Sequence, residues 1–147
     1  MVTLSLAFIV LSGVALVLWH QLLRPDLQDI FETFIPDLPL SMLLLGGILF
    51  SMINAAVEEI AFRGVIFSAL RATFAQNAVA HFGQALAFGT LHFHAGFPRG
   101  TIGVLLAVIY WFMMSVLRAR VRGMLAPWAG YVPIDITIVA ILLILAR

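Results

Sequence analysis

Residues 40–64 read LSMLLLGGILFSMINAAVEEIAFRG, a long uncharged run that ends in Glu58 and Glu59 and is followed by Arg63. A helix that crosses a membrane needs about 20 mainly apolar residues. A charged side chain at the centre of such a helix costs on the order of 2.5–3.5 kcal/mol, so these groups are rare there and mark functional sites by default. The stretch therefore predicts a membrane-spanning helix that carries a functional site.

The composition of the whole chain supports this class. Of its 147 residues, 63% are hydrophobic and 10% are charged, whereas a soluble domain carries about 25% charged residues. The net charge of +1 and the lack of a basic aromatic patch give no reason to expect nucleic-acid binding. The absence of cysteine excludes disulfides, thiolate metal ligands and a cysteine nucleophile.

We expect an all-α fold, a polytopic transmembrane helix bundle of about five spans. The spans are Val2 to Leu23, Leu40 to about Leu70, Asn77 to about His94, Thr101 to Leu117, and Leu125 to Ala146. Residues 1–39 form the first helix and a polar connector, in which residues 27–35 have the pattern of a short surface helix. Residues 40–147 form the membrane core.

The arginines indicate an orientation. One side of the bundle would hold Arg63, Arg71, Arg118, Arg120 and Arg122, and the other Arg24, Arg99 and Arg147. Because arginine is enriched in cytoplasmic loops, the first side is expected to be cytoplasmic. The N-terminus then lies in the cytoplasm.

The two glutamates are expected to have different environments. Glu59 and Arg63 are four residues apart and can form an ion pair on one helix face. Glu58 is rotated by about 100° from that face, with Asn54 one turn before it as a hydrogen-bond partner. Glu58 is thus freer to exchange a proton, as a general base must. The alternative is an ion pair at the membrane interface with no catalytic role.

A histidine closes the third span in the segment FGTLHFH. Phe88 lies one turn before His92, so its ring can wall the same face. An imidazole at this position can act as a base or as a metal ligand, although a single histidine at a helix end is also a common interfacial residue.

The last span carries a second unusual pair, Tyr131 and Asp135, again one turn apart with Pro133 between them. A carboxyl group inside an apolar helix needs a partner, and the Tyr131 hydroxyl is a candidate. The pair can serve catalysis or can stabilise a proline kink. Ser51, Ala55, Gly83 and Gly89 are expected to allow close packing between spans.

Together these motifs resemble those of the CPBP family (CAAX protease and bacteriocin-processing, or Abi) of intramembrane glutamic-type endopeptidases. The matching segments are Glu58-Glu59-x-x-x-Arg63, Phe88-x-x-x-His92, and Ala126-Pro127 followed by Asp135. The family's third motif has a histidine four residues before its asparagine or aspartate, where this chain has Tyr131. The resemblance covers about residues 40 to 145.

The resemblance implies hydrolysis of a peptide bond in a membrane-embedded or lipidated protein or peptide. Glu58 and His92 would activate a water molecule, while Glu59 and Arg63 would organise the site. Tyr131 and Asp135, in the third motif, would stabilise the oxyanion. Asn54 and Phe88 are expected to form walls of the site.

The remaining expectations concern cofactors, partners and location. We expect no cofactor, although one histidine and two glutamates could in principle hold zinc. The expected partners are a membrane substrate and the lipid bilayer, and the compact length resembles that of bacterial inner-membrane members. The tyrosine at position 131 leaves one alternative open: a non-catalytic relative that acts as a bacteriocin-immunity or membrane-peptide-binding protein.

Overall fold

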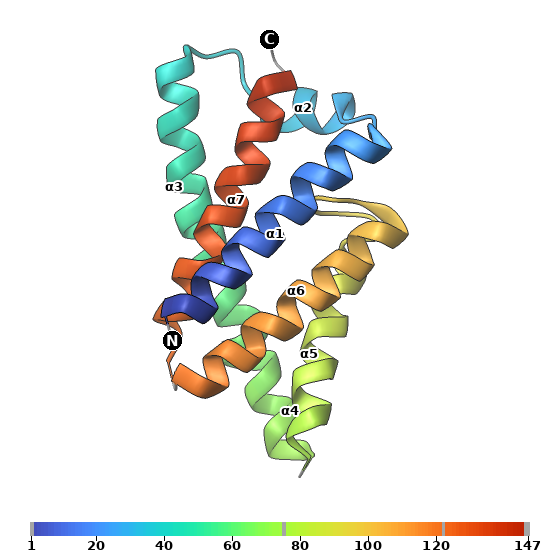
Figure 1. Cartoon of the computed structure of the whole chain (residues 1–147), viewed down its shortest axis with the longest axis vertical. Coiled ribbons are helices and arrows are strands. Elements are labelled where there is room, and N and C mark those ends of the chain that lie inside the picture. The colour runs from blue at the N-terminus through green and yellow to red at the C-terminus, as the bar shows by residue number, and fades with distance from the viewer. Residues whose placement is uncertain (1, 75, 122, 146–147) are drawn as a thin grey trace.

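The computed structural model describes residues 2–74, 76–121 and 123–145. All regular structure in these residues is helical (Figure 1). The elements are α1 (Val2–Leu23), α2 (Gln28–Phe34), α3 (Leu40–Glu58), η1 (Glu59–Ile66), α4 (Phe67–Thr73), α5 (Asn77–Leu91), α6 (Gly100–Val121) and α7 (Leu125–Leu145).

The helix lengths confirm the expected fold class, a polytopic membrane bundle. Four helical segments of the described chain are long and apolar enough to cross a membrane: Leu6–Leu23, Leu40–Thr73, Gly100–Val121 and Leu125–Ile144. The expected third span, α5, has only 15 residues, which at 1.5 Å per residue is about 22 Å. It is therefore shorter than the roughly 30 Å hydrocarbon core.

The bundle is arranged around α7. Figure 1 shows α7 between α3 and α1, with α6 and then α5 following on the far side of α1. The packed pairs include α3 with α7, α1 with α7, and α5 with α6. The N-terminal helix α1 thus packs directly against the core helices.

The charged motif lies where the longest helix changes its winding. α3, η1 and α4 run without interruption from Leu40 to Thr73, and η1 is a π-helix of eight residues that begins at Glu59. Pro39 precedes the first turn of α3, where its missing amide hydrogen has no cost. π-Helical turns are rare and often occur at functional sites.

The turn between α5 and α6 depends on glycine. Gly96 and Gly100 have φ angles of 105° and 77°, a region that side chains with a Cβ rarely adopt. The Gly100 amide donates to the carbonyl of His92 at 3.0 Å, which closes the turn. The end of α5 and the start of α6 are thereby held together.

Not all of the arginines that were expected on the cytoplasmic side lie at the surface of the bundle. The guanidinium groups of Arg71 and Arg118 lie 6.0 and 5.4 Å from the centre of the Phe67 ring, which places them at the same end of the bundle. Arg63 is fully buried and so does not report on orientation. Arg122 and Arg147 lie outside the described residues.

Candidate active site

A cavity of about 370 Å³ lies among α2, α3, α7 and the α5–α6 turn. Its polar lining residues are Asn54, Glu58, His92, Arg99, Tyr131 and Asp135, and its other lining residues are apolar side chains and glycines. Five of these six polar residues belong to the set expected from the sequence. The structure therefore brings three separate motifs to one cavity.

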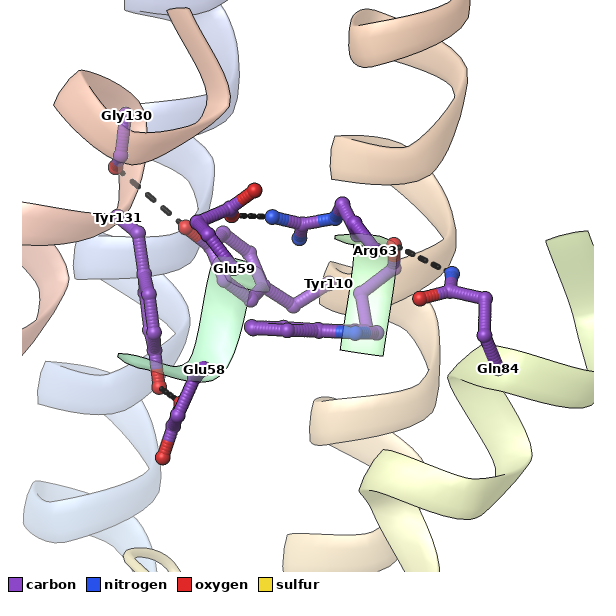
Figure 2. A network of polar contacts seen from close by, with 8 residues as sticks. Glu58, Glu59, Arg63, Gln84, Tyr110, Gly130 and Tyr131 are labelled. Atoms are coloured by element: carbon purple, nitrogen blue, oxygen red, sulfur yellow. Dashed lines mark hydrogen bonds and ion pairs between the residues drawn. The ribbon is translucent and has the colours of Figure 1, made fainter. Parts of the chain in front are cut away.

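Glu58 is bonded across the bundle rather than along its own helix. The Tyr131 hydroxyl on α7 donates a hydrogen bond to Glu58 Oε2 on α3 (Figure 2). The hydroxyl thus bonds Glu58 and not Asp135, which the sequence offers as a candidate partner. A helical side chain leans toward the N-terminus of its helix, so the phenol extends away from Asp135.

Asp135 has its own partner on α3. The side-chain amide of Asn54 donates to Asp135 Oδ2 at 3.0 Å. Asn54 and Glu58 are one turn apart on α3, and their partners Asp135 and Tyr131 are one turn apart on α7 in the reverse order. These two hydrogen bonds, hereafter the α3–α7 hydrogen bonds, connect the antiparallel helices along the cavity.

His92 caps the C-terminal end of α5. Its ring centre is 4.7 Å from that of Phe88, and its Nδ1 atom is 3.3 Å from the Phe88 carbonyl oxygen. On the other side a Cβ at Gly96 would lie 3.1 Å from His92 Nε2. The imidazole is therefore held between Phe88 and the glycine turn, with one edge on the cavity.

Glu59 and Arg63 form the expected ion pair, but they lie away from the cavity. Their relative exposures are 1% and 0%, and neither residue lines a described cavity. Figure 2 shows the Glu58 and Glu59 carboxylates pointing in different directions, as their rotation along the helix predicts. The pair faces the protein interior.

Trp111 of α6 is a central residue that the sequence did not single out. The guanidinium of Arg63 lies 4.0 Å from its ring centre, Phe88 stacks on it at 3.7 Å, and Tyr131 meets it edge-on at 5.1 Å. One fully buried indole thus contacts a residue from each of the three motifs. An aromatic residue inside an apolar span carries no sequence signal that would reveal these contacts.

A second cavity, of about 310 Å³, lies between α1, α6 and α7. Four residues line both cavities and separate one from the other: His92, Phe97, Tyr131 and Ile138. Across residues 2–74, 76–121 and 123–145, no group of three histidine, aspartate or glutamate side chains could hold a metal ion.

The membrane helix bundle carries carboxylate, imidazole and phenol groups on a shared cavity, an arrangement that fits an intramembrane hydrolase. The comparison with protein families is more specific: residues 39–137 match the model of the type II CAAX prenyl endopeptidase Rce1-like family. The match covers more than half of the chain, and the chain belongs to this family. Membership supports intramembrane protease activity of the CAAX type. No curated protein and no solved structure gives a significant match to the chain.

Proposed function

We propose that this protein is an intramembrane endopeptidase in which Glu58 and His92 activate water to hydrolyse a peptide bond of a membrane-embedded or lipidated substrate. The observation that carries the proposal is the shared cavity: Glu58 and His92 come from helices far apart in the sequence, yet both line it. A mostly apolar cavity with a few convergent polar groups is the usual form of a substrate site.

In the proposed reaction Glu58 accepts a proton from water as the water oxygen attacks the scissile carbonyl. A protonated Glu58 accepts a hydrogen bond less strongly, which releases the Tyr131 hydroxyl to donate to the developing oxyanion. Collapse of the tetrahedral intermediate then passes the proton from Glu58 to the leaving amine. His92, which lines the same cavity, holds the water for this attack.

Glu59 and Arg63 have a positioning role in this proposal, because both are buried away from the cavity. Their ion pair holds the helix turn next to Glu58 and supports Trp111, which packs on Phe88. We also propose that the reaction needs no cofactor.

The decisive experiment compares the protein termini of membranes from cells that express the wild type or Glu58→Gln. We expect new termini in the wild type that are absent from Glu58→Gln, and equally from His92→Ala. Glu32→Gln, an exposed carboxylate of α2, is the matched control and should retain every terminus. Full cleavage by Glu58→Gln would refute the proposal.

A non-catalytic relative is the second candidate, and the observation that favours it is Tyr131 at the position of the family's histidine. In this case the cavity would bind a membrane peptide without cleaving it. Glu58→Gln would then leave the biological phenotype intact, and no new terminus would depend on Glu58. The same set of strains separates the two candidates.

We further propose that the protein lies in a bacterial inner membrane with its N-terminus in the cytoplasm, on the basis of the arginines at the ends of α4 and α6. The natural chain has no cysteine, so single cysteines can be labelled without background. A membrane-impermeant maleimide should label Asp37→Cys in intact cells and Thr73→Cys only after permeabilisation. The reverse pattern would invert the orientation.

A further inference from the structure

Arg99 is a cavity residue with no role in the proposed chemistry. It is exposed, and of the described residues that line the larger cavity it is the one permanently charged cation. Within the described part of the chain it belongs to no ion pair. Its guanidinium is thus available to a group that enters the cavity.

The backbone of Arg99 is fixed relative to His92. The next amide, that of Gly100, donates to the carbonyls of His92 and Phe93 at 3.0 and 3.3 Å. Two residues before Arg99, the Phe97 ring packs edge-on against Trp19 of α1 at 5.1 Å. The base of the Arg99 side chain is therefore held at a set position from the imidazole.

The charged groups that line the cavity differ in sign and in exposure. The carboxyl groups belong to Asp135, which is buried, and Glu58, which is half-buried, whereas the positively charged Arg99 is exposed. A substrate carboxylate would be repelled by Glu58 and Asp135 and attracted to the Arg99 guanidinium. Arginine binds a carboxylate through two parallel hydrogen bonds, with geometric specificity as well as charge.

We propose that Arg99 binds a carboxylate of the substrate and thereby sets the direction in which the peptide passes Glu58. The substrate class is an apolar peptide segment that carries either an acidic side chain or a free C-terminal carboxylate near the scissile bond. This inference rests on the proposed endopeptidase function. The competing role for an exposed arginine near a membrane surface is contact with a lipid phosphate.

The test uses the full-length protein in nanodiscs and the peptide sequence around a terminus that depends on Glu58. Each peptide is paired with an uncharged analogue: Asp→Asn, Glu→Gln, or a C-terminal carboxamide. Loss of a hydrogen-bonded charge pair should raise KM about 10- to 100-fold. We therefore expect that rise for the acidic peptide with Arg99→Gln, with kcat unchanged and with no effect on the neutral analogue.

Arg99→Lys should recover part of the preference for the acidic peptide, and Arg99→Glu should reverse it toward a peptide with lysine at the same position. The analogue that loses affinity for the wild type identifies the source of the carboxylate. An equal change in KM for the acidic and neutral peptides would overturn the inference, as would an Arg99 effect that follows the anionic lipid content of the nanodisc.

Different results would overturn the endopeptidase function and the recognition of a carboxylate by Arg99. Cleavage that depends on Glu58 but ignores the charge of the peptide would overturn the role of Arg99 alone. If no terminus depends on Glu58, the endopeptidase function is wrong and the recognition of a substrate by Arg99 falls with it.

Discussion

The Tyr131 hydroxyl on α7 donates a hydrogen bond to the Glu58 carboxylate on α3. This bond joins the first and third motifs directly, with Asn54 and Asp135 bonded one turn further along the same two helices. The residue that departs from the family pattern is therefore the one that holds the proposed base. A phenol can donate a hydrogen bond as a protonated imidazole nitrogen can, so the substitution preserves a donor at this position.

Tyr131→Phe tests the importance of that donor. We expect kcat to fall about 100-fold with little change in KM, the effect of removing one donor from a transition-state oxygen. Tyr131→His, which restores the family residue, should keep most of the activity. Because the ring contact with Trp111 persists in Tyr131→Phe, and because water in the cavity can replace the donor to the half-buried Glu58, the free energy of unfolding should fall by no more than about 1 kcal/mol. Unchanged turnover in Tyr131→Phe would remove the phenol from the reaction.

The second α3–α7 hydrogen bond, from Asn54 to Asp135, predicts that substitutions of its two residues destabilise the protein to different extents. Asn54→Leu removes the donor from Asp135, which is 3% exposed, and should lower the free energy of unfolding by about 1–3 kcal/mol. Asp135→Asn keeps an acceptor for the Asn54 amide and should cost less. Thermal unfolding in detergent measures both. Equal losses would mean that the bond has no part in holding α3 on α7.

The helices of this protein could be predicted from its sequence because each span is a continuous apolar run. The start of α3 at Leu40, the start of α5 at Asn77 and the short helix α2 all follow expected segments. The ion pair of Glu59 and Arg63 was also predictable, since both residues lie on one helix. The π-helical winding of η1 was not, because it depends on packing and not on a residue pattern.

Contacts between helices could not be predicted in the same way. A single sequence shows which residues share a helix face, but not which face of another helix lies opposite. The sequence therefore offers Tyr131 as a candidate partner for its neighbour Asp135, whereas both residues in fact bond to α3. Trp111 was missed for the same reason, since its importance comes from contacts with three other helices.

The buried ion pair should be costly to break on one side only. Glu59→Leu or Arg63→Met leaves an uncompensated buried charge and should destabilise the protein by about 3–5 kcal/mol. The double variant should lose less than the two single losses added together, because no lone charge remains. A double-mutant cycle by thermal unfolding gives the coupling energy. Arg120→Met, at an exposed site on α6, is the control, and strictly additive losses would contradict the pairing.

Trp111 is expected to position the site without touching the substrate. Trp111→Leu removes the surface that Phe88 stacks on and should lower kcat at nearly constant KM, with a loss of about 3 kcal/mol in stability. Trp111→Phe should rescue most of the kcat. The indole N–H has no hydrogen-bond partner within the described residues, so phenylalanine leaves no group unsatisfied.

The control for Trp111 is Trp128 of α7, whose indole donates to the Met52 carbonyl at 3.0 Å and which lines neither cavity. Trp128→Phe should cost about 1 kcal/mol of stability for the lost hydrogen bond and should leave kcat unchanged. A parallel loss of kcat at both tryptophans would mean that activity simply follows stability.

Two glycines of α5 should respond to alanine in opposite ways. At Gly83 a Cβ would approach Leu70 Cδ1 at 2.9 Å, the end of a flexible side chain that can move. Gly83→Ala should therefore be neutral or stabilising by up to about 1 kcal/mol, the usual gain of alanine over glycine within a helix. At Gly89 a Cβ would lie 3.0 Å from the Val104 carbonyl oxygen and would clash with the Val108 side chain.

Because the Val104 oxygen belongs to the α6 backbone, Gly89→Ala can be accommodated only if α5 moves away from α6. Overpacking of this kind costs about 1–3 kcal/mol. The same displacement would carry His92, three residues further along the chain, away from the cavity, so kcat should fall as well. Unfolding midpoints and initial rates of the two variants provide the comparison. A stable and fully active Gly89→Ala would show that the close approach of α5 to α6 does not position His92.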